Sequence, residues 1–131
     1  MQKIFEQLKN YITTNEDDRP RLIIGPSRSG KTRLIESLNL KKNKCCVLTT
    51  KDLRNENLKT FLSNFYGFGL RVLIVDGIEE IESVYPSFMK DLSFILKSFR
   101  KEKKLRHLKV IVTSCHVEVY KYGWQSYYLR R

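Results

Sequence analysis

Apolar residues along the chain recur with two different spacings, which together predict helices alternating with short buried strands. Residues 2–13 place apolar side chains three and four positions apart, as on one face of an amphipathic helix. The segments 22–24, 45–50 and 71–76 are instead short, mainly apolar runs of the kind found in buried strands. Because the run at 71–76 is apolar nearly throughout, we expect its strand to be central, with helices covering both faces of the sheet.

Helical spacing returns between these strands and after them. It predicts helices around 34–38, 58–65 and 86–99, the last being the longest amphipathic stretch. A fourth strand is expected at 110–113, and the alternation over 117–129 indicates one or two more. Strands and helices that alternate in this way predict an α/β fold, with a mostly parallel central sheet flanked by helices and joined by right-handed crossovers.

The length and composition fit a single domain. A chain of 131 residues with a hydrophobic fraction of 41% is large enough to bury a core and too small for two independent ones. We therefore assign 1–131 to one domain, in which 1–14 form an N-terminal helix. We favour packing of its apolar face on the sheet, and the alternative is that this face docks onto a partner subunit. No apolar run approaches the roughly 18 residues that span a bilayer, so we expect a soluble intracellular protein without a membrane partner. The cysteines, Cys45, Cys46 and Cys115, match neither a disulfide framework nor a zinc site and are expected to be buried.

The net charge of +11 favours polyanionic partners, because lysines and arginines release the counterions condensed on nucleic acid. Much of this charge follows the longest predicted helix, where the candidate DNA-contacting residues are Lys101, Lys103, Lys104 and Arg106. The same cluster could equally be the solvated end of a helix, and part of the charge could serve only solubility. Nucleic acid, bound directly or within a complex, is the partner class that the charge predicts.

A glycine-rich loop between the first strand and the following helix is the most specific motif. It fits the phosphate-loop pattern, with glycine at both ends of a short run and then lysine and threonine. Its residues are Gly25, Pro26, Ser27, Arg28, Ser29, Gly30, Lys31 and Thr32. In such a loop backbone N–H groups approach phosphate oxygens closely, and the pattern therefore predicts binding of a nucleotide. We expect Lys31 to contact the β- and γ-phosphates, and the Thr32 hydroxyl to bind Mg²⁺.

An acidic residue at the end of the 71–76 strand supplies the second half of such a site. Asp76 follows four apolar residues and is expected to hold the Mg²⁺ through water. Glu79, Glu80 and Glu82 come soon afterwards, and one of them could activate a water molecule. We favour the simpler interpretation that these three form a solvated acidic turn.

Together these motifs resemble the RecA-like recombinases, and in particular the eukaryotic recombinase paralogues. Arg28 to Thr32 is similar to the recombinase phosphate loop, and Asp76 to Ile78 is similar to the family's Asp-Ser-Ile turn. Thr113 to Cys115 falls where recombinases carry Thr-Asn-Gln. The segment from Tyr122 to Arg131 is similar to a segment of the family in which a glycine and a tryptophan come first. In the family these two residues are followed by a strand that is rich in leucine and ends in arginine.

The resemblance implies a RecA-like P-loop core and an ATP-binding adaptor in homologous recombination and DNA repair. It also implies single- or double-stranded DNA as a partner, bound directly or only as part of a complex. Such an adaptor would support recombinase filament assembly in the nucleus, as a heterodimer with a SWIM-domain protein of a Shu-type complex or with another recombinase paralogue. Two departures predict weak or absent hydrolysis. Recombinases carry a catalytic glutamate where this chain has Thr49 to Asp52, and Cys115 replaces their glutamine sensor of the γ-phosphate.

Two other classes fit the same motifs. The first is an AAA+-type ATPase of DNA replication, such as an origin-binding protein, a clamp loader or a helicase loader. In that class Glu79 or Glu80 would aid hydrolysis, and Thr113 or Ser114 would sense phosphate. Because the class normally has a C-terminal helical lid and the sequence stops at Arg131, we rank it second. A small nucleotide kinase ranks last, because no acceptor site is apparent.

Overall fold

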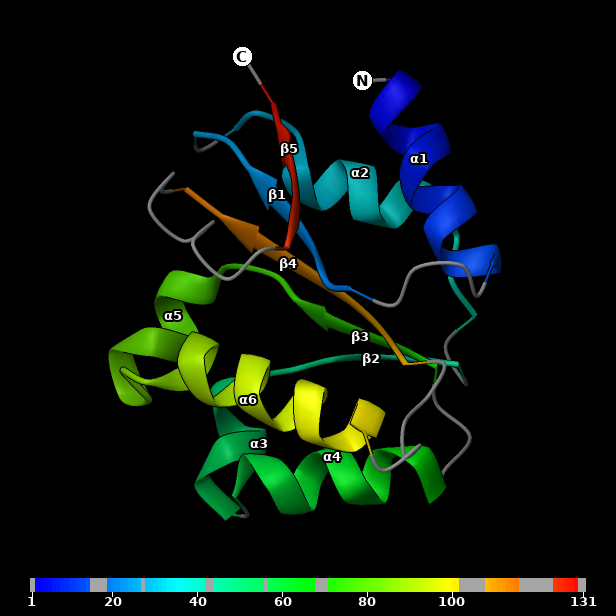
Figure 1. The fold of residues 1–131 in the computed structure, drawn as a ribbon. Helices are drawn as coiled ribbons and strands as arrows, with labels where there is room; N and C mark the ends of the chain where they lie inside the picture. Colours follow the sequence, from blue (N-terminus) through cyan, green and yellow to red (C-terminus); the bar gives the residue numbers. More distant parts are fainter. Residues whose placement is uncertain are drawn as a thin grey trace.

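The computed structural model describes residues 2–14, 19–26, 28–41, 44–55, 57–67, 71–101, 108–115 and 124–129. These residues form one five-stranded sheet with the strand order β2-β3-β4-β1-β5, and each neighbouring pair of strands is parallel (Figure 1). The strands are β1 (Arg21–Ile24), β2 (Cys45–Val47), β3 (Val72–Val75), β4 (Lys109–Ser114) and β5 (Gln125–Tyr128). The predicted α/β fold with a parallel sheet is therefore confirmed.

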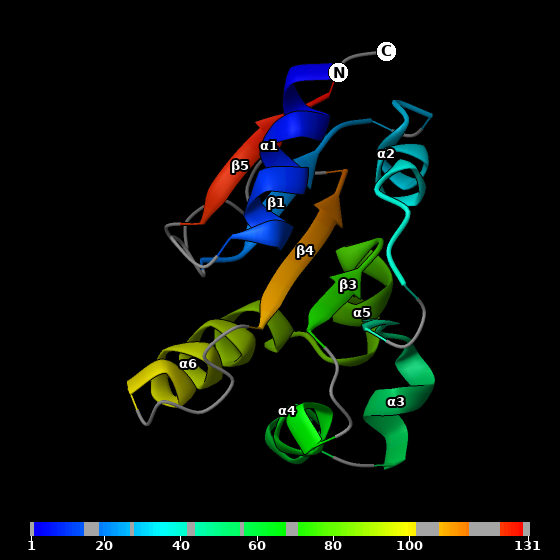
Figure 2. The same cartoon turned by 90° about the vertical axis from the view of Figure 1, so that its right-hand side faces the viewer.

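Helices cover both faces of the sheet, as Figures 1 and 2 show. One face carries α1 (Gln2–Thr13) and α2 (Lys31–Ser37). The other carries α3 (Thr50–Asn55), α4 (Leu58–Gly67), α5 (Ile78–Val84) and α6 (Phe88–Lys101). Because side chains alternate along a strand, Ile23 of β1 joins the apolar cluster under α1 and α2, whereas its neighbours Leu22 and Ile24 join the opposite cluster. The continuous apolar runs in the sequence follow from this two-sided burial.

Two strand predictions need correction. The central strand is β4, and β3 lies one place nearer the edge, because β4 inserts between β3 and β1. The second strand ends at Val47 and does not reach Thr50. It is cut short because Thr49 directly precedes α3 and caps it. The N–H and the hydroxyl of Thr49 donate to Asp52 Oδ2 at 2.8 and 3.1 Å.

The expected acidic turn after Asp76 is also wrong, since residues 78–84 form the helix α5. Gly77 precedes this helix with a φ of 89°, a conformation that favours glycine. Ile78 and Ile81 are 0% and 3% exposed and hold the helix on the sheet. The acidic side chains of this segment are therefore placed by a packed helix.

Tyr11 joins α1 to the sheet at the end where β4 begins. Its hydroxyl accepts a hydrogen bond from the Val110 N–H at 2.9 Å. The Arg21 guanidinium carbon lies 4.2 Å from the centre of the ring, and Lys109 Nζ lies 4.9 Å from it. The apolar face of α1 thus packs on its own sheet, as predicted. No helix in the described part of the chain combines the length and apolarity that would let it cross a membrane.

Candidate nucleotide-binding site

The glycine-rich loop lies at the carboxyl edge of the sheet, between β1 and α2 (Figure 1). Gly25 directly follows β1, and its N–H donates to the Ser114 carbonyl at 3.0 Å, which joins the loop to the end of β4. A Cβ atom at Gly25 would lie 2.6 Å from Ser29 Oγ and 2.9 Å from the Leu129 carbonyl oxygen. Only glycine fits there without moving the backbone of the neighbouring segment.

The loop turns sharply before α2 and leaves a pocket on its outer side. Arg28 has a φ of 65° and Gly30 a φ of 96°, and the Ser29 N–H donates to the Pro26 carbonyl at 3.2 Å. The pocket has a volume of about 510 Å³ and is lined by residues 28–33. Ser27 lies outside the described residues.

Lys31 is held across the loop by main-chain oxygens. Its Nζ donates to the carbonyls of Gly25 and Pro26, the second at 2.8 Å. It also lies 3.8 Å from the sulfur of Cys115, which is exposed and not buried as we expected. An ammonium group has three donors and no acceptor, so this arrangement fixes a positive charge beside the pocket. Arg28 and Arg33 are exposed on its rim.

Thr32 and Asp76 meet although they come from different elements. The Thr32 hydroxyl donates to Asp76 Oδ2 at 2.9 Å. The Thr113 hydroxyl donates to the other oxygen, Oδ1, at 2.8 Å, and accepts from the Gly77 N–H at 2.7 Å. Hydroxyl groups from two other segments, α2 and β4, thereby fix the orientation of the Asp76 carboxylate.

The donors at this point suit Mg²⁺, which prefers hydroxyl, carboxylate and phosphate oxygens. Thr32 and Asp76 would hold the ion, and it would supply charge neutralisation to bound phosphates. Among the described residues, no group of three or more His, Cys, Asp or Glu could hold a metal ion by itself. The site therefore fits an ion that completes its coordination with phosphate oxygens and water.

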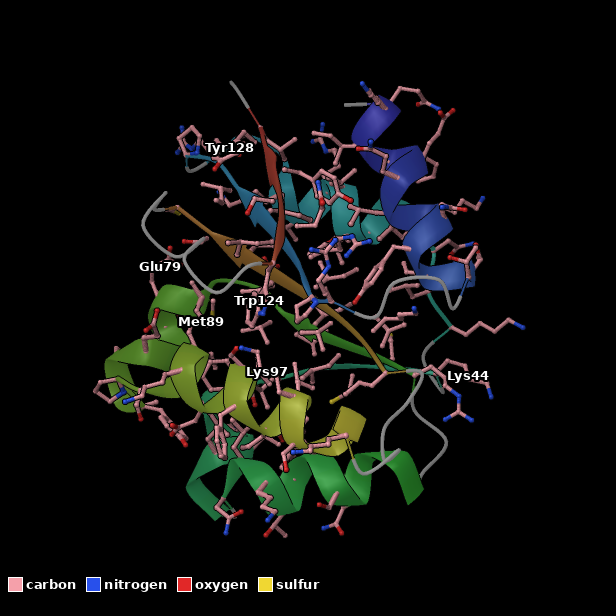
Figure 3. The ribbon with its side chains drawn as sticks, in the orientation of Figure 1. Lys44, Glu79, Met89, Lys97, Trp124 and Tyr128 are labelled. Atoms are coloured by element: carbon pink, nitrogen blue, oxygen red, sulfur yellow. The ribbon has the colours of Figure 1, made fainter. Side chains whose placement is uncertain are left out.

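Glu79, which we interpreted from the sequence as part of a solvated acidic turn, is a residue of the site. It lies on α5 at the same edge of the sheet (Figure 3), and its Oε1 accepts from the Ser114 hydroxyl at 2.8 Å and from the Cys115 N–H at 2.6 Å. These partners are 35 and 36 residues away along the chain, so no local pattern could indicate the contact. The carboxylate fixes the end of β4 beside Lys31.

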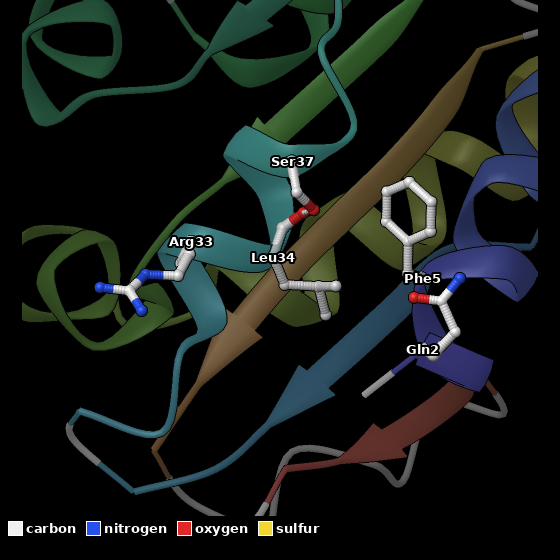
Figure 4. Close-up of a pocket in the computed structure, with 5 residues that line it drawn as sticks. All are labelled: Gln2, Phe5, Arg33, Leu34 and Ser37. Carbon is white, nitrogen blue, oxygen red and sulfur yellow. Dashed lines mark hydrogen bonds between the residues drawn. The ribbon is translucent and has the colours of Figure 1, made fainter.

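A second hollow, between α1 and α2, adjoins the phosphate loop (Figure 4). It has a volume of about 390 Å³ and is lined by Gln2, Phe5, Arg33, Leu34 and Ser37. Arg33 lines this hollow as well as the pocket at the loop, so the two are neighbours. The second is the more apolar in character, because Phe5 and Leu34 contribute to its wall.

The structure brings most of the predicted site residues together. Gly25, Pro26, residues 28–32 and Asp76 all lie at the carboxyl edge of the sheet. Of the four candidate DNA-contacting residues, Lys101 is exposed at the last position of α6. The other three, Lys103, Lys104 and Arg106, lie outside the described residues.

The segment where recombinases carry a catalytic glutamate offers no equivalent group at this site. Asp52 caps α3 through Thr49 and is thereby engaged within its own helix. Cys115, in the place of the glutamine sensor, does lie beside Lys31.

The sequence matches no protein-family model and shows no significant match to a curated protein. Solved structures with a similar fold include a DNA replication initiation factor, with a TM-score of 0.63 and 14% identity. They also include the ORC2 protein of Aeropyrum pernix in ADPNP–ADP complexes, with a TM-score of 0.58 and 12% identity. The likeness covers 97% of this chain and 44% of the first protein, and 98% of this chain and 46% of the second.

The chain thus spans less than half the length of each of these proteins. At such low identity the likeness establishes the fold alone, an α/β fold with a parallel sheet flanked by helices. Neither protein carries the name of a recombinase, and the comparisons give no support to the RecA-like resemblance.

Proposed function

We propose that this chain is an ATP- and Mg²⁺-binding P-loop module of the AAA+ type that acts in DNA replication. The observation that carries the proposal is the meeting of Thr32 and Asp76 at 2.9 Å, beside a lysine fixed on the loop carbonyls. A hydroxyl and a carboxylate suit the metal, and the ammonium group suits the phosphates. These are the elements that a P-loop needs to bind a nucleoside triphosphate.

The replication class is favoured over the recombinase adaptor by the fold comparisons. One similar structure is a DNA replication initiation factor, and the other was solved with nucleotides. The end of the sequence at Arg131 is not evidence against the AAA+ class, because both proteins extend well beyond the matched region. The SWIM-domain partner, the nuclear location and the role in recombination stay predictions from the resemblance.

The two neighbouring hollows suit the two parts of a nucleotide. The phosphates would occupy the pocket lined by residues 28–33, near Lys31. The base and sugar could extend into the hollow between α1 and α2, where Phe5 and Leu34 offer apolar contact. Arg33, which lines both, would lie between the two parts of the ligand.

We also propose that hydrolysis is slow. Asp76 is followed by Gly77, so no carboxylate comes directly after the metal-side acid. The carboxylate of Glu79 lies close to the end of β4, but Ser114 and Cys115 both donate to it. Hydrogen bonds donated to an ionised carboxylate make it a weaker proton acceptor, which opposes the role of general base.

A magnesium titration of ATP binding tests the nucleotide site. In the unaltered protein Mg²⁺ should strengthen ATP binding, and Asp76→Asn should weaken the Mg²⁺-dependent binding by roughly tenfold to a hundredfold. The matched control is Glu80→Gln, which removes the same charge from an exposed position on α5 and should leave ATP affinity unchanged. Binding that is indifferent to Mg²⁺, or to Asp76→Asn, would contradict the proposal.

Steady-state ATP turnover, with and without DNA, tests the replication class. We expect turnover below about 1 per second, with DNA changing the rate. Faster turnover would show that the chain supplies an effective base and would overturn the proposal of slow hydrolysis. A rate that neither single-stranded nor duplex DNA alters would count against a role in replication while leaving nucleotide binding intact.

A further inference from the structure

The outer face of α6 carries an exposed aromatic side chain among lysines. Lys90, Phe94, Lys97 and Lys101 follow one another at intervals of four, three and four residues, so they share one face of the helix. All four are exposed, and Phe94, at 74%, is more exposed than any other large apolar side chain that the structure describes. We call this set the α6 stripe; Figure 3 labels Lys97 within it.

Phe94 borders a hollow and is therefore more than an isolated apolar residue on the surface. The hollow has a volume of about 310 Å³ and lies between α4 and α6, with Leu58, Ile95 and Tyr85 in its wall. Lys59 of α4 lies on its rim and adds a further exposed cation. An aromatic ring beside a partly apolar hollow, edged by positive charges, is suited to a flat ring that is attached to an anion.

The acidic residue of this hollow is already engaged by its neighbours. Asp91 Oδ2 accepts from the Tyr85 hydroxyl at 2.6 Å and from the Ser87 hydroxyl at 3.0 Å. Burial and these contacts with Asp91 raise the pKa of Tyr85 to about 12, so its hydroxyl stays a donor at neutral pH. The Asp91 charge is thereby directed toward the start of α6.

We propose that the α6 stripe binds single-stranded nucleic acid. A base would stack on the Phe94 ring at the mouth of the hollow, while Lys90, Lys97 and Lys101 contact phosphates of the backbone. Every base offers a face for stacking, so this contact is tolerant of sequence. The stripe extends over about 16 Å along the helix, from Lys90 to Lys101, which suits successive phosphates of an extended strand.

Three features favour this partner over a duplex or a protein. The bases of a duplex are stacked on one another and cannot reach Phe94, although the lysines could still contact its phosphates. The cores of protein interfaces are depleted in lysine, whereas here lysines flank the single aromatic ring. The net charge of +11 adds a long-range attraction for polyanions.

The inference does not depend on nucleotide binding at the phosphate loop. The α6 stripe lies on a helix of the α3–α6 face, whereas Lys31 begins a helix of the opposite face (Figure 2). Lys31→Ala should therefore leave oligonucleotide binding unchanged. Failure of one proposal is in this way distinguishable from failure of the other.

The first test measures binding of a short fluorescein-labelled oligothymidylate to the full chain by fluorescence anisotropy. Phe94→Ala should weaken binding by about tenfold, because it removes the stacking partner of one base. Phe94→Trp should retain the affinity. The matched control is Tyr128→Ala, which removes an aromatic ring that is 54% exposed on β5 and should have no effect.

The second test removes the positive charges of the stripe and measures the affinity and its dependence on salt. Replacing Lys90, Lys97 and Lys101 by glutamine should weaken binding and lower the slope of log affinity against log salt by about 2, since each phosphate contact on a single strand contributes about 0.7. The control has the same change of charge at exposed lysines elsewhere, Lys3, Lys41 and Lys51. Thermal melting of each variant checks that it is folded.

The proposal is supported if the affinity depends on Phe94 and the stripe lysines and is weaker for the duplex. It is overturned if Phe94→Ala binds the oligonucleotide as well as the unaltered protein does, or if the control lysine variant loses as much affinity as the stripe variant. Self-association that Phe94→Ala abolishes, without any affinity for the oligonucleotide, would overturn it in favour of a protein interface.

Discussion

Lys31 and Lys109 lie on the same parallel sheet but at opposite ends of its strands. Lys31 follows the carboxyl end of β1, where its ammonium group donates to loop carbonyls beside an open pocket. Lys109 begins β4 at the other end; its side chain is 2% exposed, and its Nζ lies 4.9 Å from the centre of the Tyr11 ring. Arg21 lies close to the same ring.

The difference follows from what covers each end. At the carboxyl end the chain turns away in loops, so Lys31, Thr32 and Asp76 keep access to a ligand. At the amino end α1 covers the sheet, and an aromatic ring stabilises the buried cations. We therefore expect changes at the first end to affect nucleotide affinity, and changes at the second to affect stability.

The largest expected effect is at the covered end. Tyr11→Ala should lower the free energy of unfolding by about 3–5 kcal/mol, because it removes a buried ring from the apolar cluster and from two cations. Tyr11→Phe keeps the ring and should cost about 1–2 kcal/mol, through the hydrogen bond lost by the Val110 N–H. Denaturant unfolding measures both. An unchanged midpoint for Tyr11→Ala would contradict the structural role of this end.

A smaller effect is expected at the hollow beside the phosphate loop. Phe5→Ala should weaken ATP binding by roughly two- to tenfold, because the base would lose an aromatic contact. Binding of inorganic triphosphate, which lacks a base, should be unchanged. Calorimetric titration of the two ligands separates the effects, and an equal loss for both would show that Phe5 acts on the fold of the site instead.

The smallest expected effect is on the rates at which the cysteines react with an alkylating agent. Cys115 is exposed beside Lys31 and should react with iodoacetamide first, and bound ATP should slow that reaction. Burial raises the pKa of Cys46, with the charge of Asp52 and then Cys45 adding to the shift, so less thiolate is present at neutral pH. Its reaction should accelerate only as the pH rises above the ordinary range for a thiol. Mass spectrometry of the alkylated peptides reports both rates.

The raised pKa of Cys46 also gives a pH dependence of stability. A thiol with a higher pKa in the folded state holds its proton more tightly there than in the unfolded chain. Its contribution to stability is therefore complete below the unfolded pKa and is lost as the pH rises through the folded value. Replacing Cys46 by serine should reduce that alkaline loss.

The sequence was sufficient to predict the parts of the site that depend on local pattern. A glycine-rich loop between an apolar strand and a helix specifies its own turn, and Asp76 is marked by the apolar run before it. Because parallel strands end at one edge, the approach of Thr32 to Asp76 also follows from the fold class.

The remaining features depend on contacts between distant segments. The role of Glu79 arises only once α5 packs beside the end of β4, and seven residues with an acidic first turn give a weak helical signal. The strand β2 is shorter than the sequence predicted, because Thr49 and Asp52 start a helix where apolar residues suggested that the strand would continue. The pairing of Tyr11 with Lys109 likewise joins residues that no local pattern connects.

Isothermal titration of ATP in the presence of Mg²⁺, with Lys31→Ala beside the unaltered protein, tests the central claim most directly. Removal of the charged hydrogen-bond donor should weaken ATP binding by at least about tenfold, with the melting temperature nearly unchanged. Lys44→Ala, at an exposed position at the opposite edge of the sheet, should bind ATP as the unaltered protein does. Equal affinity in Lys31→Ala and the unaltered protein would contradict the claim that this loop binds a nucleoside triphosphate.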